Sequence, residues 1–131
     1  MDRQRFLKLL QRAVQKDASD IHLKTGSVVY FRVDGQILSQ EGDPLLTEDI
    51  DGILDILLSR EQKDFFMKRG DLDLAFTEKG VGRFRVNAFR QRGSVSLVMR
   101  RIKSKIMTIE QLNLPLAVNR FATMQRGLIL L

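Results

Sequence analysis

The sequence contains no cysteine and one histidine, His22, and these shortages exclude several kinds of chemistry. Without cysteine the chain has no disulfide framework, no thiolate nucleophile and no cysteine-based metal site, which suits a reducing compartment. One histidine is too few for a histidine-based zinc site. Because His22 stands beside Asp20 on the polar side of an expected strand, we interpret it as a surface or hydrogen-bonded residue and expect no metal centre.

Long apolar runs and aromatic residues are also scarce. No stretch approaches the ~20 apolar residues of a membrane span, and the N-terminus leads into an amphipathic pattern, so we expect a soluble cytoplasmic protein. There is no tryptophan and Tyr30 is the one tyrosine, which leaves few platforms for stacking on bases. We therefore expect no nucleic-acid partner, although a small nucleic-acid binder would account for the positive charge.

Basic residues, in contrast, are abundant. Twenty-two Lys and Arg against sixteen Asp and Glu give a formal charge of +6, which favours anionic partners such as nucleotide phosphates, acidic lipid or an acidic protein face. Acidic residues concentrate between positions 41 and 78, whereas positions 79–105 contain nine Lys or Arg and no acid. The basic segment is therefore the first place to look for a binding site.

Alternation of apolar and polar residues predicts short antiparallel strands separated by turns. Asp34-Gly35 is a strong two-residue hairpin signal, Lys79-Gly80 marks a second turn, and Arg92-Gly93 marks a third. The strands are expected at 21–23, 29–33, around Ile37, 72–76, 82–90 and 94–102.

Apolar residues at helical spacing predict a first helix over 3–15. Thr47 is expected to cap a second helix, and Ser59 with Gln62 forms the capping box of a third, which ends near Gly70. The 44% hydrophobic content over 131 residues is sufficient for one core. Together these elements predict an α+β fold, an antiparallel sheet with helices packed on one face.

The register of the last hairpin follows from its apolar residues. With the turn at 92–93, these residues oppose one another on the buried face if Arg85 lies directly opposite Arg100 on the other face. Like charges in this position repel, so the pair would accept an anion such as phosphate between the two guanidinium groups. The alternative is that Asp73, expected opposite Asn87 and diagonal to Arg85, neutralises the site as an ordinary salt bridge.

The C-terminal part differs in kind from the domain before it. Residues 103–105 are typical of a linker, Thr108 with Gln111 forms a second capping box, and Pro115 interrupts or restarts a helix. The all-apolar run 128–131 is typical of a strand buried on both faces of a parallel sheet. We prefer the interpretation in which this sheet belongs to a further domain. The alternative is an apolar C-terminal segment that docks on the domain formed by the preceding residues.

Four short segments follow one another along the chain: Ala18-Ser19-Asp20-Ile21-His22-Leu23, Arg32-Val33-Asp34-Gly35, Gly82-Arg83-Phe84-Arg85-Val86-Asn87-Ala88-Phe89 and Arg126-Gly127-Leu128. In this order they resemble the PilT and PilU ATPases of the type IV pilus retraction system. In that family the last segment leads into the strand before the Walker A loop, and these 131 residues contain no Walker A sequence. The resemblance implies a PAS-like N-terminal domain over 1–102, followed by a linker and the first strand of a RecA-like ATPase domain over 103–131.

The resemblance also implies roles for individual residues in a hexameric motor that binds ATP and Mg²⁺ in its full-length form. Arg85 and Arg100, with Arg83 as third choice, match arginines that approach the ATP phosphates when the two domains close. Arg120 and Arg126 fall near the expected position of the base and sugar.

The second arginine of the pair stays open, because Arg101 and Lys103 follow Arg100 where neutral residues are usual in the family. The implied partners are RecA-like domains of the same and neighbouring subunits and the inner-membrane platform protein of the pilus, at whose machinery the motor acts in twitching motility. By itself the chain is expected not to hydrolyse ATP. The alternative function is a stand-alone PAS-like module that binds a protein or an anionic ligand on its basic sheet face.

Overall fold

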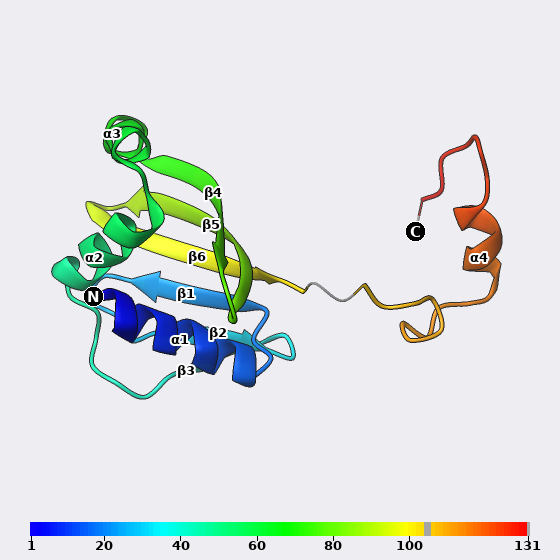
Figure 1. The fold of residues 1–131 in the computed structure, drawn as a ribbon, viewed down its shortest axis with the longest axis horizontal. Helices are drawn as coiled ribbons and strands as arrows, with labels where there is room; N and C mark the ends of the chain where they lie inside the picture. Colours follow the sequence, from blue (N-terminus) through cyan, green and yellow to red (C-terminus); the bar gives the residue numbers. More distant parts are fainter. Residues whose placement is uncertain (104–105, 131) are drawn as a thin grey trace.

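The computed structural model describes residues 1–103 and 106–130. Within them, helices and strands follow one another in an α+β arrangement, as expected from the sequence (Figure 1). The elements are α1 (Arg3–Gln15), β1 (Asp20–Lys24), β2 (Tyr30–Val33), β3 (Gln36–Ser39), α2 (Thr47–Leu57), α3 (Arg60–Arg69), β4 (Asp71–Glu78), β5 (Gly82–Gln91), β6 (Ser94–Ile102) and α4 (Ala117–Ala122).

The strands of the described residues form one six-stranded antiparallel sheet in the order β3-β2-β1-β6-β5-β4. Each half is a meander of three consecutive strands, and the pairing of β1 with β6 joins the two halves. The hairpins turn where the sequence predicted, because Asp34-Gly35 and Arg92-Gly93 each adopt positive φ at both positions, as a two-residue turn between twisted strands requires. Lys79-Gly80 lies in the loop between β4 and β5.

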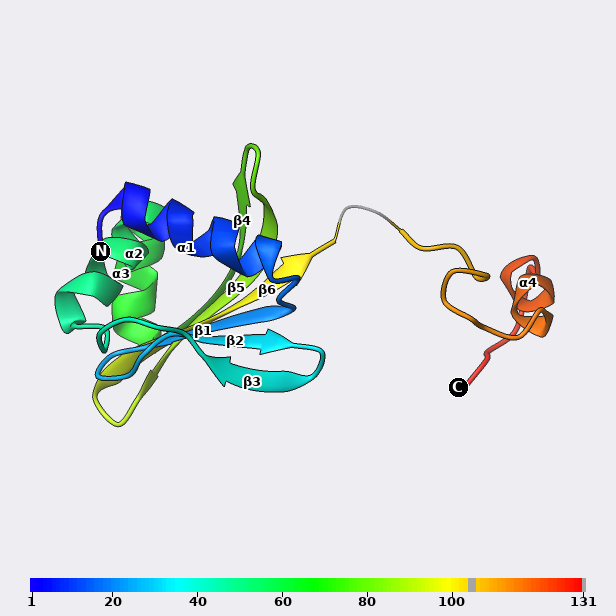
Figure 2. The same ribbon diagram turned by 90° about the horizontal axis from the view of Figure 1, so that it is seen from below.

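Helices α1, α2 and α3 lie on one side of the sheet (Figure 2). Their apolar residues meet the apolar face of the central strands in one core, so the prediction of helices packed on one face is confirmed. Within the described residues the opposite face of the sheet carries no helix. Polar side chains of β1, β4, β5 and β6 border a hollow of the sheet, and Arg32 of β2 pairs with Asp20 among them. The largest fully buried side chains are Phe6, Phe31, Phe66, Phe84, Leu10, Ile21, Leu23, Ile50, Ile53, Leu97, Met99 and Val86.

The ends of the helices α2 and α3 depend on local hydrogen bonds. Ser59 and Gln62 form the predicted capping box of α3, and Gly70 ends that helix with φ of 82°. The prediction that Thr47 caps α2 is wrong by one residue, because Leu46 is the N-cap. Its backbone N–H donates to Asp49 Oδ2 at 3.0 Å, so the carboxylate in the first turn reaches back to cap the helix.

The tail, residues 106–130, extends away from the sheet in both views (Figures 1 and 2). The predicted capping box between Thr108 and Gln111 is present, and α4 follows Pro115. The expected strand 128–131 is not formed in the described part, since residues 128–130 are irregular and the side chain of Leu128 is 84% exposed. The linker predicted at 103–105 and Leu131 lie partly or wholly outside the described residues.

Candidate functional site

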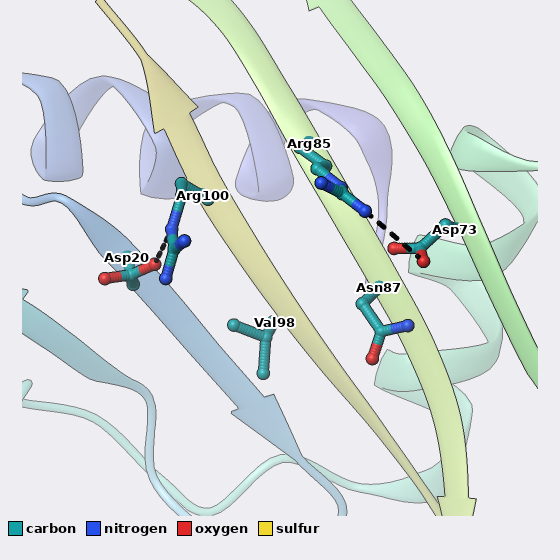
Figure 3. A pocket seen from close by; sticks show the side chains of 6 residues that line it. All are labelled: Asp20, Asp73, Arg85, Asn87, Val98 and Arg100. Atoms are coloured by element: carbon teal, nitrogen blue, oxygen red, sulfur yellow. Dashed lines mark hydrogen bonds and ion pairs between the residues drawn. The ribbon is translucent and has the colours of Figure 1, made fainter. Parts of the chain in front are cut away.

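Two neighbouring strands of the open sheet face bring the predicted arginines together. Arg85 on β5 and Arg100 on β6 lie directly opposite each other in the register, as the hairpin pattern predicted. They border a hollow of about 360 Å³ on the face without helices (Figure 3). Its lining residues are Asp20, Asp73, Arg85, Asn87, Val98 and Arg100.

The two guanidinium groups point away from each other, each toward a carboxylate on the strand beyond (Figure 3). Arg85 Nη2 lies 3.6 Å from Asp73 Oδ2, whereas Arg100 donates from Nε to Asp20 Oδ1 at 2.9 Å. The predicted alternative, an ion pair between Asp73 and Arg85, is present. A carboxylate on each neighbouring strand thus offsets the repulsion between the opposed arginines.

Asp20 is the most constrained charged group of the hollow. Its side chain is 5% exposed, and Oδ2 accepts a hydrogen bond from Ser19 Oγ at 2.9 Å and lies 3.3 Å from Arg32 Nε. Burial by itself raises the pKa of Asp20, but the hydrogen bonds from Arg100 and Ser19 and the charges of Arg100 and Arg32 outweigh it, so the net pKa is lowered. The carboxylate therefore stays ionised between two cations.

Sequence reasoning missed the role of Asp20 and Arg32 at this site. Asp20 falls on the polar side of its strand, and both residues lie within segments that carry the family resemblance, yet nothing local indicates their partner. The pairing of β1 with β6 joins residues 80 positions apart and places Asp20 opposite Arg100. That pairing depends on the packing of the whole sheet.

His22 lies next to this site on the open face, opposite Val98 of β6. Burial lowers the pKa of His22, and the charge of Arg32 acts in the same direction while Asp20 opposes it. Its Nε2 is buried and has no hydrogen-bond partner among the described residues. The structure thus differs from the prediction of a surface or hydrogen-bonded His22 at Nε2, and the expectation that His22 is no catalytic base stays a prediction.

The remaining predicted site residues lie elsewhere. Arg83 borders a second, neighbouring hollow of about 280 Å³ that it shares with Arg85 and Asp73. Arg101 points to the other side and forms an ion pair with Asp17. Arg120 and Arg126 belong to the tail, so the structure does not bring them to the hollow.

Among residues 1–103 and 106–130, no cluster of three or more His, Asp or Glu is arranged to hold a metal ion. No helix in these same ranges is long and apolar enough to cross a membrane. The acidic residues of α2 have other roles, since Asp49 caps the helix and Asp55 forms an ion pair with Lys63.

Known proteins similar to this chain include type IV pilus ATPases. No protein-family model matches the chain. The type IV pilus ATPase PilU of Pseudomonas aeruginosa is 34% identical over 126 residues, which cover 95% of this chain and 33% of PilU. The type IV pilus retraction ATPase PilT of the same species is 36% identical over 126 residues, which cover 94% of this chain and 36% of PilT.

Solved structures agree with the sequence relatives. The pilus retraction motor PilT with bound ADP superposes with a TM-score of 0.73 at 32% identity over 86% of this chain and 33% of that one. The ATPase DotB of Legionella pneumophila gives a TM-score of 0.77 over 97% of this chain and 37% of that one, and at 21% identity it shows the shared fold. The chain spans about a third of the length of the relatives it matches. Over about a third of their length, the chain is therefore a homologue of the PilU and PilT type IV pilus ATPases.

Proposed function

We propose that this chain is the N-terminal domain of a hexameric type IV pilus retraction motor that hydrolyses ATP during twitching motility. In this proposal the domain is PAS-like and is followed by a RecA-like domain, which supplies the phosphate cradle and the magnesium site. The open sheet face meets ATP bound at the junction between the domains of the same or a neighbouring subunit. The assembled motor acts at the pilus machinery, on its inner-membrane platform protein.

The observation that carries the proposal is the hollow between Arg85 and Arg100. Arg100 uses Nε for Asp20, and within the described residues its two terminal nitrogens make no hydrogen bond. Such a planar pair of donors suits phosphate oxygens. Arg85 is 69% exposed and held at 3.6 Å, so a phosphate would compete with Asp73 for it at little cost.

Two other features support the proposal. The related PilT structure contains ADP, which makes a nucleotide the first ligand to test for the parent of this chain. The tail exposes many large apolar side chains, among them Ile106, Leu116, Leu128 and Leu130, and exposed apolar residues in such number are typical of a surface that another domain covers. We propose that the RecA-like domain covers them and that Arg120 and Arg126 then lie near the base and sugar.

ATP turnover by the full-length parent tests the assignment of the arginines. We expect Arg85→Ala and Arg100→Ala each to lower kcat by on the order of 100-fold, because each removes a donor to charge that develops on the transferring phosphoryl group. Arg60→Ala is the matched control, since Arg60 is exposed at the start of α3 in the helical layer, and it should leave turnover unchanged. Wild-type turnover in both open-face variants would contradict the assignment.

The folding of these variants should differ. Arg85→Ala should change the free energy of unfolding by less than about 0.5 kcal/mol, as is usual for an exposed side chain. Arg100→Ala should cost about 1 kcal/mol, because it removes one hydrogen bond from a carboxylate that is 5% exposed. Turnover is therefore compared at a temperature where both variants are folded.

The alternative function is a stand-alone module that binds an anion on the same face. The coding sequence of the gene distinguishes this alternative from the motor. If the coding sequence continues beyond Leu131 into a glycine-rich loop ending in Gly-Lys-Ser or Gly-Lys-Thr, the motor proposal stands. If a stop codon follows, the module is the better account of the open face.

A further inference from the structure

The two carboxylates that border the hollow are held in different ways. Asp73 is 55% exposed, and its distance of 3.6 Å from Arg85 is longer than a hydrogen bond. Asp20 is 5% exposed and contacts three donors, Ser19 Oγ, Arg32 Nε and Arg100 Nε. Asp73 is thus a loosely held surface residue, whereas Asp20 is a buried residue with three contacts.

Asp20 joins three neighbouring strands through these contacts. Arg32 on β2 and Arg100 on β6 lie opposite Asp20 on β1 in the same row of the sheet. Each arginine is gripped at Nε, the nitrogen nearest its aliphatic stem. This contact limits the rotation of the Arg100 side chain and still leaves its terminal nitrogens open. Most of the side-chain entropy that Arg100 would lose on binding a ligand is therefore already lost when the protein folds.

We propose that Asp20 is a positioning residue, which fixes Arg100 so that its terminal nitrogens are presented to a phosphate group in the hollow, whereas Asp73 competes with that phosphate for Arg85. The proposal rests on the proposed function, in which the phosphate belongs to ATP. Ser19 and Arg32 in turn hold the carboxylate of Asp20 in place. Asp73, in contrast, lowers the affinity of the hollow for anions in the unliganded domain.

Electrostatics and positioning make different predictions for the variants Asp20→Ala and Asp73→Ala. Asp20→Ala and Asp73→Ala each remove one negative charge from the same hollow, so electrostatics by itself predicts that both variants bind a phosphate more tightly. Positioning predicts that Asp20→Ala weakens catalysis in spite of the more favourable charge. The matched pair therefore separates the two explanations.

The test is steady-state ATP turnover of the full-length parent. We expect Asp20→Ala to lower kcat about tenfold or more, because small displacements of a positioned group cost at least this much. Asp20→Asn keeps one oxygen acceptor and should restore part of the loss. Asp73→Ala should keep kcat and lower KM by about threefold.

A double variant shows whether Asp20 acts through Arg100. In the Arg100→Ala background, the further change Asp20→Ala should alter kcat by less than about twofold, since the group it positions is already gone. A purely structural role would add its full effect in both backgrounds. In the 131-residue chain, the Nε–H resonance of Arg100 in ¹⁵N–¹H spectra should shift in Asp20→Ala and stay unchanged in Asp73→Ala.

The outcomes separate this inference from the proposed function. Wild-type turnover in both Arg85→Ala and Arg100→Ala would contradict the proposed role of the hollow and the inference with it. Wild-type turnover in Arg100→Ala together with low turnover in Arg85→Ala would overturn the inference alone. Low turnover in Arg100→Ala together with wild-type turnover in Asp20→Ala would overturn the inference and leave the proposed function standing. If Asp20→Ala does not fold, Ser19→Ala removes one exposed donor to Asp20 and should lower kcat in the same direction by a smaller factor, and an unchanged kcat would then count against the inference.

Discussion

Single residues on the open face show how a sheet tolerates two opposed cations. Arg85 and Arg100 are direct neighbours across β5 and β6, yet each turns outward to a carboxylate. The two ion pairs differ in exposure, and a buried partner constrains a side chain more than an exposed one. Burial thus explains why Arg100 is held and Arg85 is loose.

Acid should reveal the contribution of Asp20. Its pKa is lowered below the ordinary value of 3.8 in the folded chain, so its ionised form stabilises the fold at pH values above 3.8, and this contribution is lost as the pH falls through the folded pKa. We expect the difference in free energy of unfolding between wild type and Asp20→Ala, measured by urea denaturation, to shrink as the pH is lowered below 3.8. A difference that is constant from pH 6 to pH 2 would contradict this expectation.

Among the elements, helix α2 shows how a contact can reverse an intrinsic preference. Gly52 lies in the middle of this helix, where glycine is unfavourable by about 1 kcal/mol relative to alanine. A Cβ at Gly52 would clash with the backbone carbonyl oxygen of Met1. The amino group of Met1 is in turn bound to the carbonyl oxygens of Glu48 and Asp49 at 3.0 and 2.9 Å. Glycine is therefore needed to seat the N-terminus on α2.

Gly52→Ala should consequently destabilise the domain although it raises helix propensity. We expect a loss of about 1–3 kcal/mol, the usual cost of overpacking, in the free energy of unfolding. Asp51→Ala at the neighbouring exposed position is the control and should stay within about 0.5 kcal/mol. A more stable Gly52→Ala variant would show that Met1 moves aside freely.

At the scale of the whole molecule, one core serves the sheet and the helices α1–α3. The residues of that core end with Met99 on β6, whereas the large apolar residues of the tail are mostly exposed. Compact structure and exposed apolar surface therefore divide near Ile102. The domain boundary between 1–102 and 103–131 stays a prediction.

Removal of the tail tests this boundary. A chain of residues 1–102 should fold cooperatively, with a melting temperature within a few degrees of that of the 131-residue chain, because the tail extends away from the core. Calorimetry of the two chains gives the comparison. A large drop in melting temperature for 1–102 would mean that the tail packs on the domain in solution.

The sequence by itself determined the local structure of this protein. Turn residues with positive φ, capping boxes and alternating apolar residues are local signals, so the helices, the hairpins and the opposition of Arg85 to Arg100 could be predicted. Thr47 shows the limit of such signals. It was predicted to cap α2, but Leu46 is the N-cap and its backbone N–H donates to the side chain of Asp49.

The tertiary structure decided what the local signals do not contain. The pairing of β1 with β6 connects residues 80 positions apart, and many other strand orders satisfy the same hydrophobic pattern. That pairing buries Asp20, places it between Arg32 and Arg100, and leaves the terminal nitrogens of Arg100 free of hydrogen bonds within the described residues. The chemistry of the site thus arises from contacts between distant segments, which form because folding buries the apolar faces of both meanders in one core.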